Sequence, residues 1–154
     1  MIMLKEKLKN HNIILASGSP RRHQFLLDMD IPFTVNIKSV KEDYPTHLKG
    51  AEISDYLSEL KARVFINELK PNDILITSDT IVWHKEKALG KPETIQDAHK
   101  MLASLSGETH EVITSVTITT PVKQETFNST TRVTFKELSR EEIDHYIRTC
   151  NPMD

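Results

Sequence analysis

Apolar positions in the first fifty residues predict a short helix, two strands and a loop. Leu4 and Leu8 stand one helical turn apart in a stretch rich in Lys and Glu, which predicts a short surface helix. The apolar run 12–16 predicts a buried strand, and the alternating segment 33–37 predicts a second strand. Residues 38–50 are polar and include a proline, so we expect an irregular loop there.

The segment between these two strands predicts a helix that begins directly after a tight turn. Ser19 is suited to the N-cap, and Pro20 is suited to the first helical position. We expect the inward face of this helix to carry Phe25, Leu26 and Met29. The chain therefore begins its fold with a strand, a tight turn and a helix.

The middle of the chain predicts a long amphipathic helix followed by a buried strand. Apolar residues recur at intervals of three and four from Ile53 to Phe65, and we expect the helix to end near Leu69. Residues 74–77 form an apolar run that predicts a strand, and this run leads into Ser78-Asp79-Thr80.

Capping and turn signals predict a helix and a hairpin in the second half of the chain. Thr94, with Asp97 three residues later, predicts the start of a helix that ends before Gly107. Segments 111–120 and 125–135 are rich in Val, Ile and Thr and flank a short turn, which predicts an antiparallel hairpin.

A final helix is predicted over residues 141–149, with Ser139 and Glu142 as its capping box. Helices and strands follow one another without internal repeats or an obvious linker. This order predicts one α/β or α+β domain over residues 1–154, built around a mixed sheet with flanking helices.

Composition narrows the class of protein. Lys and Arg number 20 against 22 Asp and Glu, a net charge of −2, which argues against nucleic-acid binding through a broad basic surface. The chain contains neither an apolar run that could span a bilayer nor an N-terminal apolar stretch long enough for a signal peptide. Cys150 is the sole cysteine, so an intrachain disulfide is excluded. We therefore expect a cytoplasmic protein that binds neither nucleic acid nor membranes.

The first candidate for chemistry is the segment Ser17-Gly18-Ser19-Pro20-Arg21-Arg22, between the first strand and its helix. A helix N-terminus offers unpaired N–H groups and a partial positive charge, and Arg binds phosphate oxygens in pairs of hydrogen bonds. Two arginines in a first turn are unfavourable for the helix itself, which favours an anion site. The alternative is a capped turn with two solvated arginines.

Four further residues carry weaker signals. Asp79 follows the apolar run 74–77, where a carboxylate can serve as a base, bind a metal or simply hold a turn. Lys91 stands between a glycine and a proline, Glu42 lies in the polar loop, and Lys61 lies within the long helix. From the residues alone, all three are typical of solvated surface.

Taken together, these segments resemble the Maf family of nucleoside triphosphate pyrophosphatases. The resemblance covers nearly the whole chain and is carried by LASGSPRR (15–22), SDTIV (78–82), LGKP (89–92), DAHKMLASLSG (97–107) and HEVITSV (110–116). It implies a mixed α/β fold of two lobes around a nucleotide-binding cleft. It also implies hydrolysis of a nucleoside triphosphate to the monophosphate and pyrophosphate, and it suggests a homodimer.

The resemblance assigns roles to individual residues. Ser17, Arg21 and Arg22 would hold phosphates, with Arg21 also near the base of the nucleotide. Asp79 would accept a proton from water, and Lys91 matches the lysine of the family's Gly-Lys-Pro motif.

The less securely aligned Glu42 and Lys61 would face the triphosphate or its metal. Carboxylates suit a hard divalent cation, so Mg²⁺ or Mn²⁺ would be held by Glu42 and Asp79.

The resemblance also bears on specificity. Arg21 and Thr80 match members that act on dTTP and UTP, whereas members acting on 7-methyl-GTP tend to carry Trp and Gln at these positions. The alternatives are therefore a 7-methyl-GTP pyrophosphatase or a non-catalytic, nucleotide-binding regulator of cell division. Ser78 and Ser115 depart from the common Ala and Gly of the family. The family continues beyond Asp154, so we also expect part of its C-terminal fold to be missing.

Overall fold

The computed structural model describes residues 3–150. The expected lack of a C-terminal part of the fold concerns a region outside these residues. The described chain divides into two compact units. One unit comprises the chain up to Asp79 together with Thr114–Asn128, and the other comprises Thr80–Ile113 together with the chain from Ser129 onward. Strands β3, β5 and β6 contribute residues to both units.

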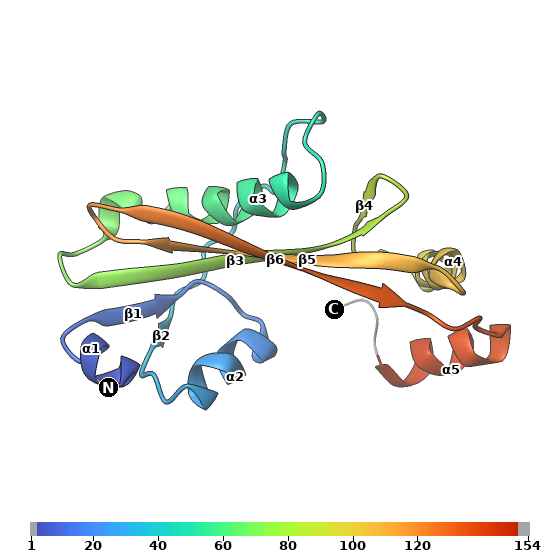
Figure 1. The fold of residues 1–154 in the computed structure, drawn as a ribbon, viewed down its shortest axis with the longest axis horizontal. Helices are drawn as coiled ribbons and strands as arrows, with labels where there is room; N and C mark the ends of the chain where they lie inside the picture. Colours follow the sequence, from blue (N-terminus) through green and yellow to red (C-terminus); the bar gives the residue numbers. More distant parts are fainter. Residues whose placement is uncertain (1–2, 151–154) are drawn as a thin grey trace. The chain divides into compact units, whose positions relative to one another are not determined.

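The strands of the described residues pair in the order β2-β1-β3-β5-β6, and β4 pairs with β3 (Figure 1). Strand β1 is parallel to β2 and to β3, whereas β4 is antiparallel to β3. The expected mixed sheet with flanking helices is confirmed. The strands are β1 (Asn12–Leu15), β2 (Thr34–Val35), β3 (Asp73–His84), β4 (Lys87–Leu89), β5 (Thr109–Thr119) and β6 (Gln124–Thr134).

In the first unit, helices cover both faces of the sheet, which explains why β1 is an uninterrupted apolar run. Leu15 packs with Leu26 on one face, whereas Ile14 packs against a cluster containing Ala62 on the other. Alternate side chains of a strand point to opposite faces, so both faces need apolar residues. Figure 1 shows α2 and α3 on opposite sides of β1. The helices are α1 (Leu4–Leu8), α2 (Pro20–Asp28) and α3 (Ala51–Arg63).

Of the three residues expected on the inward face of α2, two are exposed, so the prediction was wrong for them. Leu26 is buried, but Phe25 is 64% exposed and Met29 is 51% exposed. Successive helical residues are rotated by roughly 100°, so Phe25 points well away from the stripe centred on Leu26. Met29 is the C-cap and follows the last residue of the helix.

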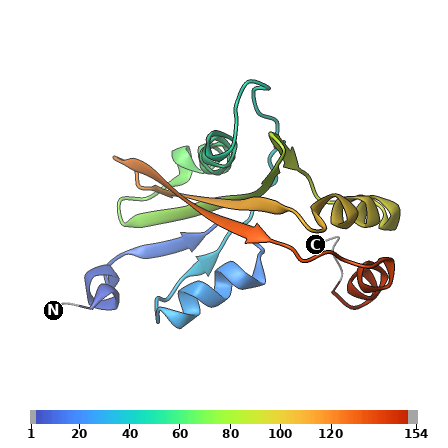
Figure 2. The same cartoon turned by 45° about the vertical axis from the view of Figure 1, so that its right-hand side comes forward.

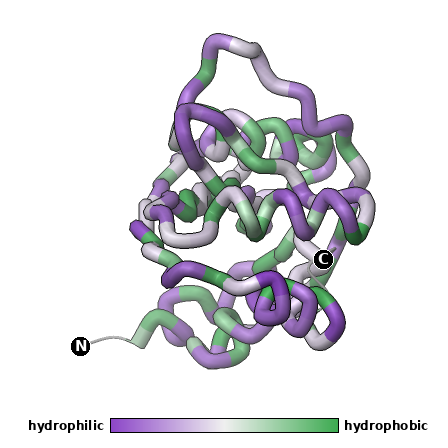
Figure 3. Tube along the Cα trace, turned by 90° about the vertical axis from the view of Figure 1, so that its right-hand side faces the viewer, coloured by the Kyte–Doolittle hydropathy of each residue, from purple (hydrophilic) through white to green (hydrophobic). Residues whose placement is uncertain are grey.

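Helix α3 ends at Arg63, earlier than the expected Leu69, and a short 3₁₀ turn η1 (Ile66–Glu68) follows it. The loop predicted over residues 38–50 contains neither helix nor strand in the structure. In Figure 3 the loop that rises beyond α3 is largely hydrophilic in colour, as its composition predicts.

Strand β3 runs without a break through Ser78 and Asp79, so the expected end of the strand at residue 77 was wrong. Ser78 and Asp79 are buried, as is Thr77, whereas Thr80 is exposed. The Thr77 hydroxyl donates to the Ser58 carbonyl at 2.7 Å, and the Ser78 hydroxyl donates to the Ser115 carbonyl at 2.8 Å. Because these hydroxyls have partners inside the fold, the strand tolerates them in its interior.

The second unit contains α4 (Ile95–Leu105) and α5 (Arg140–Cys150), which lie side by side (Figure 2). Their predicted caps are confirmed: Asp97 donates its N–H to the Thr94 hydroxyl at 3.0 Å, and Glu142 donates its N–H to the Ser139 hydroxyl at 3.1 Å. Between the helices, His99 Nε2 lies 3.1 Å from Asp144 Oδ1.

The predicted hairpin is also confirmed, as β5 and β6. Facing threonine hydroxyls join the two strands within each unit, at 2.9 Å between Thr117 and Thr126 and at 2.7 Å between Thr109 and Thr134. Strand β4 was not predicted. Among residues 3–150, no helix combines the length and the apolar character needed to cross a membrane.

Candidate active site

The candidate site lies where β1 ends and β3 continues. Ala16 N–H still donates to the Ile76 carbonyl at 3.0 Å, and the chain then leaves the sheet at Ser17. The next β3 carbonyl on that side, Ser78, therefore has no β1 residue beside it. Side chains supply its donors, because Arg22 Nη1 lies at 3.2 Å and Lys61 Nζ lies at 3.4 Å. An arginine from α2 and a lysine from α3 thus meet at one backbone oxygen.

The loop between β1 and α2 is ordered around Ser17. The Ser17 hydroxyl, which is buried, accepts from the Ser19 N–H at 3.1 Å and from Arg22 Nη1 at 3.4 Å. His23 Nε2 lies 2.6 Å from the Ser17 carbonyl. Ser19 occupies the N-cap position of α2, as predicted. Its side chain, however, forms no capping hydrogen bond, so the expectation that it caps the helix was wrong. An N-terminus without a side-chain cap is suited to an anion.

Lys61 lies between two carboxylates. Its Nζ is 2.8 Å from Asp79 Oδ1 and 3.1 Å from Glu42 Oε1. The Asp79 side chain is 8% exposed and the Lys61 side chain 20% exposed, whereas that of Glu42 is 54% exposed. The loop predicted over residues 38–50, the helix α3 and the strand β3 therefore each contribute one charged group.

Burial dominates the electrostatics of Asp79. Desolvation raises the pKa of Asp79, the hydrogen bond from Lys61 opposes that rise, and the charge of Glu42 adds to it. Asp79 Oδ2 is buried and has no hydrogen-bond partner among the described residues. A desolvated carboxylate oxygen with no partner is suited to accept a proton or to bind a cation. Burial also lowers the pKa of Arg22.

A pocket of about 280 Å³ opens beside these groups. This volume is near the lower end of the ~300–1,000 Å³ range that is typical of small-molecule sites. Its walls come from the segment that follows β1, from α2, from the polar loop, from α3 and from β3. The lining residues that carry charge or side-chain hydroxyls are Ser17, Arg22, Lys38, Ser39, Glu42, Lys61 and Ser78.

The carboxylates fit a divalent cation in a limited way. Among residues 3–150, no group of three or more His, Cys, Asp or Glu side chains is placed to hold a metal. Mg²⁺, however, is often bound by one or two carboxylates together with substrate phosphates and water. Asp79, with its unpaired Oδ2, and the nearby Glu42 match this second arrangement.

The structure brings together four of the predicted site residues beside Asp79 or its pocket: Ser17, Arg22, Glu42 and Lys61. Arg21 lies in the first turn of α2 but is exposed and does not line the pocket. Thr80 and Lys91 are also exposed, and both belong to the second unit.

Sequence reasoning missed two contributors, His23 and the Ser78 carbonyl. His23 follows the arginine pair directly, but nothing in its type or spacing indicated a bond to the Ser17 carbonyl. A backbone acceptor such as Ser78 has no signature in the sequence. The sequence of α3 did carry a signal, because Ser54 and Ser58 are four residues apart and so share one face of the helix. Both serines are fully buried in the structure. That spacing indicates a polar helix face that needs hydrogen-bond partners.

The buried serine face of α3 explains why Ser115 can stand where glycine is common in the family. The Ser115 hydroxyl lies 2.6 Å from Asp55 Oδ1 and 2.7 Å from the Ser54 hydroxyl. The Ser58 hydroxyl lies 2.6 Å from that of Thr117. These bonds hold α3, which carries Lys61, on β5 within the first unit.

Comparison with known proteins gives the same assignment along the whole chain. The family model for Maf, described as Maf-like protein, matches residues 12–154. A protein of Flavobacterium johnsoniae named dTTP/UTP pyrophosphatase is 55% identical over 152 residues, which are 99% of this chain and 78% of that protein. A Christiangramia forsetii protein of the same name is 54% identical over 152 residues, with the same shares of the two chains.

Solved structures add a likeness in fold. The Staphylococcus aureus Ham1 protein matches with a TM-score of 0.55 at 15% identity, over 79% of this chain and 70% of that one. A dITP/XTP pyrophosphatase from Mycobacterium abscessus matches with a TM-score of 0.55 at 11% identity, over 80% of this chain and 73% of that one. Identities this low support the fold alone.

Proposed function

Because the chain belongs to the Maf family, we propose that it is a nucleoside triphosphate pyrophosphatase that hydrolyses dTTP and UTP to the monophosphate and pyrophosphate. The names of the relatives at 55% and 54% identity support this substrate class. The observation that carries the proposal is the meeting of Arg22, Lys61 and the buried carboxylate Asp79 at the end of β1. We place the reaction in the cytoplasm.

Asp79 is the proposed general base. Its unpaired Oδ2 accepts a proton from a water molecule, whose oxygen then forms a bond to the α-phosphorus. The bond from the α-phosphorus to the bridging oxygen breaks, and pyrophosphate leaves with the electron pair. The base must be ionised to act, and the hydrogen bond from Lys61 favours that form.

Positive groups stabilise the charge that builds on the phosphoryl oxygens. Arg22 is held at the pocket by the Ser17 hydroxyl and the Ser78 carbonyl, so little reorganisation is needed when phosphate binds. Lys61 supplies a second cation. Arg21 and Lys91 are proposed to act on the phosphates as well, and Thr80 to act in substrate selection.

A divalent cation completes the proposed site. Mg²⁺ or Mn²⁺, held by Glu42 and Asp79, would neutralise charge on the departing pyrophosphate when bound. The partner of the protein is thus the nucleoside triphosphate, and we propose a homodimer as its assembly.

A panel of triphosphates tests the function. Purified protein is incubated with dTTP, UTP, dCTP or 7-methyl-GTP in the presence of Mg²⁺ or Mn²⁺, and pyrophosphate release is measured. We expect dTTP and UTP to be the best substrates. Preferred hydrolysis of 7-methyl-GTP would assign the alternative specificity, and binding without any turnover would favour a regulatory protein.

A further inference from the structure

Lys61 occupies the space between the two carboxylates that are the proposed metal ligands. Its Nζ contacts Asp79 Oδ1 at 2.8 Å, Glu42 Oε1 at 3.1 Å and the Ser78 carbonyl at 3.4 Å. An ammonium group has three N–H donors, and three acceptors surround this one. The lysine is therefore fully engaged by the groups that would otherwise attract a cation.

An ammonium and a metal ion compete for the same two carboxylates. Lys61 occupies Asp79 Oδ1 and Glu42 Oε1, and its positive charge also opposes a metal at the unpaired Asp79 Oδ2. Two carboxylates and one lysine leave one net negative charge, where the carboxylates alone would offer two. Asp79 and Lys61 are mostly buried, so their attraction is screened less than that of a surface pair. A divalent cation approaching the nucleotide-free site must offset this attraction before it binds.

Phosphate groups provide a way to release the carboxylates. Arg22 and Lys61 donate to the same Ser78 carbonyl, so an anion held by Arg22 lies within reach of the Lys61 ammonium. Glu42 is the exposed member of the pair of carboxylates and is the one that solvent can rehydrate most easily. Transfer of the ammonium from Glu42 to a phosphate oxygen would free carboxylate oxygens for the metal.

We propose that Lys61 acts as a resident counter-ion that suppresses metal binding in the free protein, so that the metal binds together with the triphosphate. The species recognised by this site is then the metal complex of the nucleoside triphosphate. This inference rests on the proposed function and specifies the form of its substrate.

Titration with Mn²⁺ alone tests the competition directly, since electron paramagnetic resonance measures the free ion without any turnover. The wild-type protein is expected to bind Mn²⁺ weakly. Lys61→Met is expected to bind it at least about tenfold more tightly, within the range typical of coupling between two ligands. Lys61→Arg keeps the positive charge, so its affinity for Mn²⁺ is expected to stay as weak as that of the wild type.

Lys38→Met is the matched control for a general change in charge. Lys38 also lines the pocket, but its ammonium pairs with Glu68 and not with either proposed metal ligand. Its removal should change Mn²⁺ affinity much less than removal of Lys61. Equal effects of the two substitutions would overturn the proposal, as would unchanged or weaker Mn²⁺ binding in Lys61→Met.

A second measurement uses the wild-type protein and does not depend on any variant folding. The α,β-methylene analogue of dTTP resists cleavage at the α–β bridge, and its presence should raise Mn²⁺ affinity above that of the protein or the analogue alone. Tight Mn²⁺ binding by the nucleotide-free wild type would overturn the proposal. Failure of the proposed function would appear separately, as absence of pyrophosphate release from every triphosphate.

Discussion

Lys61 donates a hydrogen bond to Asp79 across 2.8 Å and thereby joins α3 to β3 at the candidate site. The bond has two consequences. It compensates part of the cost of burying the Asp79 charge, and it directs one carboxylate oxygen toward the lysine while the other keeps no partner among the described residues. The predictions for variants of Asp79 and Lys61 follow from this difference between the two oxygens, one bonded to Lys61 and the other unpaired.

Asp79→Asn should reduce pyrophosphate release by about 10²–10⁴-fold, the usual contribution of a general base. An amide accepts no proton from water under these conditions, while the size of the side chain is unchanged. Nucleotide binding, measured by calorimetry without added metal, should persist because Arg22 and Ser17 remain. Turnover equal to that of the wild type would show that another group is the base.

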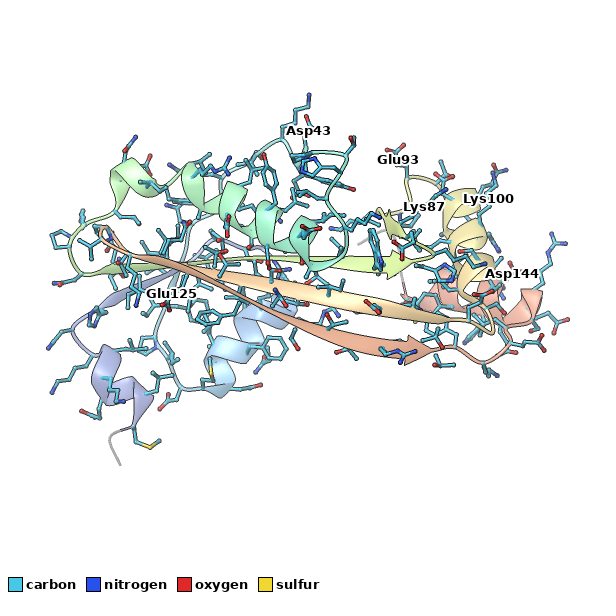
Figure 4. All side chains as sticks on the ribbon, turned by 45° about the horizontal axis from the view of Figure 1, so that its top comes forward. Asp43, Lys87, Glu93, Lys100, Glu125 and Asp144 are labelled. Atoms are coloured by element: carbon cyan, nitrogen blue, oxygen red, sulfur yellow. The ribbon has the colours of Figure 1, made fainter. Side chains whose placement is uncertain are left out.

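Glu42→Gln should reduce turnover, and Asp43→Asn should leave it unchanged. The two carboxylates are neighbours in the same loop, but Glu42 contacts Lys61, whereas Asp43 is exposed and pairs with Lys41. Figure 4 shows Asp43 on the loop beyond α3. The Mn²⁺ concentration that gives half-maximal turnover should rise for Glu42→Gln and stay unchanged for Asp43→Asn. If both substitutions had the same effect, the loss would reflect the charge of the loop and not a contact of Glu42.

Lys61→Met should move the acidic limb of the pH profile of kcat/KM to higher pH. Asp79 acts in its ionised form, so activity rises as pH increases through its pKa, which burial has already raised. Removing the Lys61 hydrogen bond removes an influence that lowers this pKa, and more alkaline solution is then needed to ionise the base. A limb that stays in place or moves to lower pH would contradict the assignment of Asp79.

Thr117→Val should lower the free energy of unfolding by about 1–3 kcal/mol, because it removes two hydrogen bonds and leaves the Ser58 and Thr126 hydroxyls only their bonds to the Asp55 carbonyl and to Glu59. Thr117 lies 2.6 Å from the fully buried Ser58 hydroxyl and 2.9 Å from that of Thr126. Urea unfolding measures the change. Thr130→Val, at an exposed position of β6, is the control and should be close to neutral. Equal effects would mean that the buried pair contributes nothing specific.

Local signals in the sequence were sufficient for most elements. Thr94 and Ser139 cap their helices through bonds that span three residues, so a short window of sequence contains the whole interaction. The apolar run at β1 was also decisive, because a strand covered by helices on both faces has a distinctive composition.

Elements whose polar residues find distant partners were harder to predict. Ser78 and Asp79 suggested the end of a strand. Their side chains are instead bonded to the Ser115 carbonyl and the Lys61 ammonium, which lie far away in the sequence and keep both residues inside the strand. The burial of Leu26 without Phe25 was likewise decided by which stripe of a short helix meets the sheet.

The sequence by itself determined the chemical inventory of this protein: a basic segment after the first strand, a carboxylate in β3, and a set of motifs that resembles one family. Those properties depend on residue type and order, which a chain retains whatever its conformation. The tertiary structure decided which charges meet. Only the folded first unit places Lys61 between Asp79 and Glu42, because three separate segments must pack before their charges come within hydrogen-bond distance.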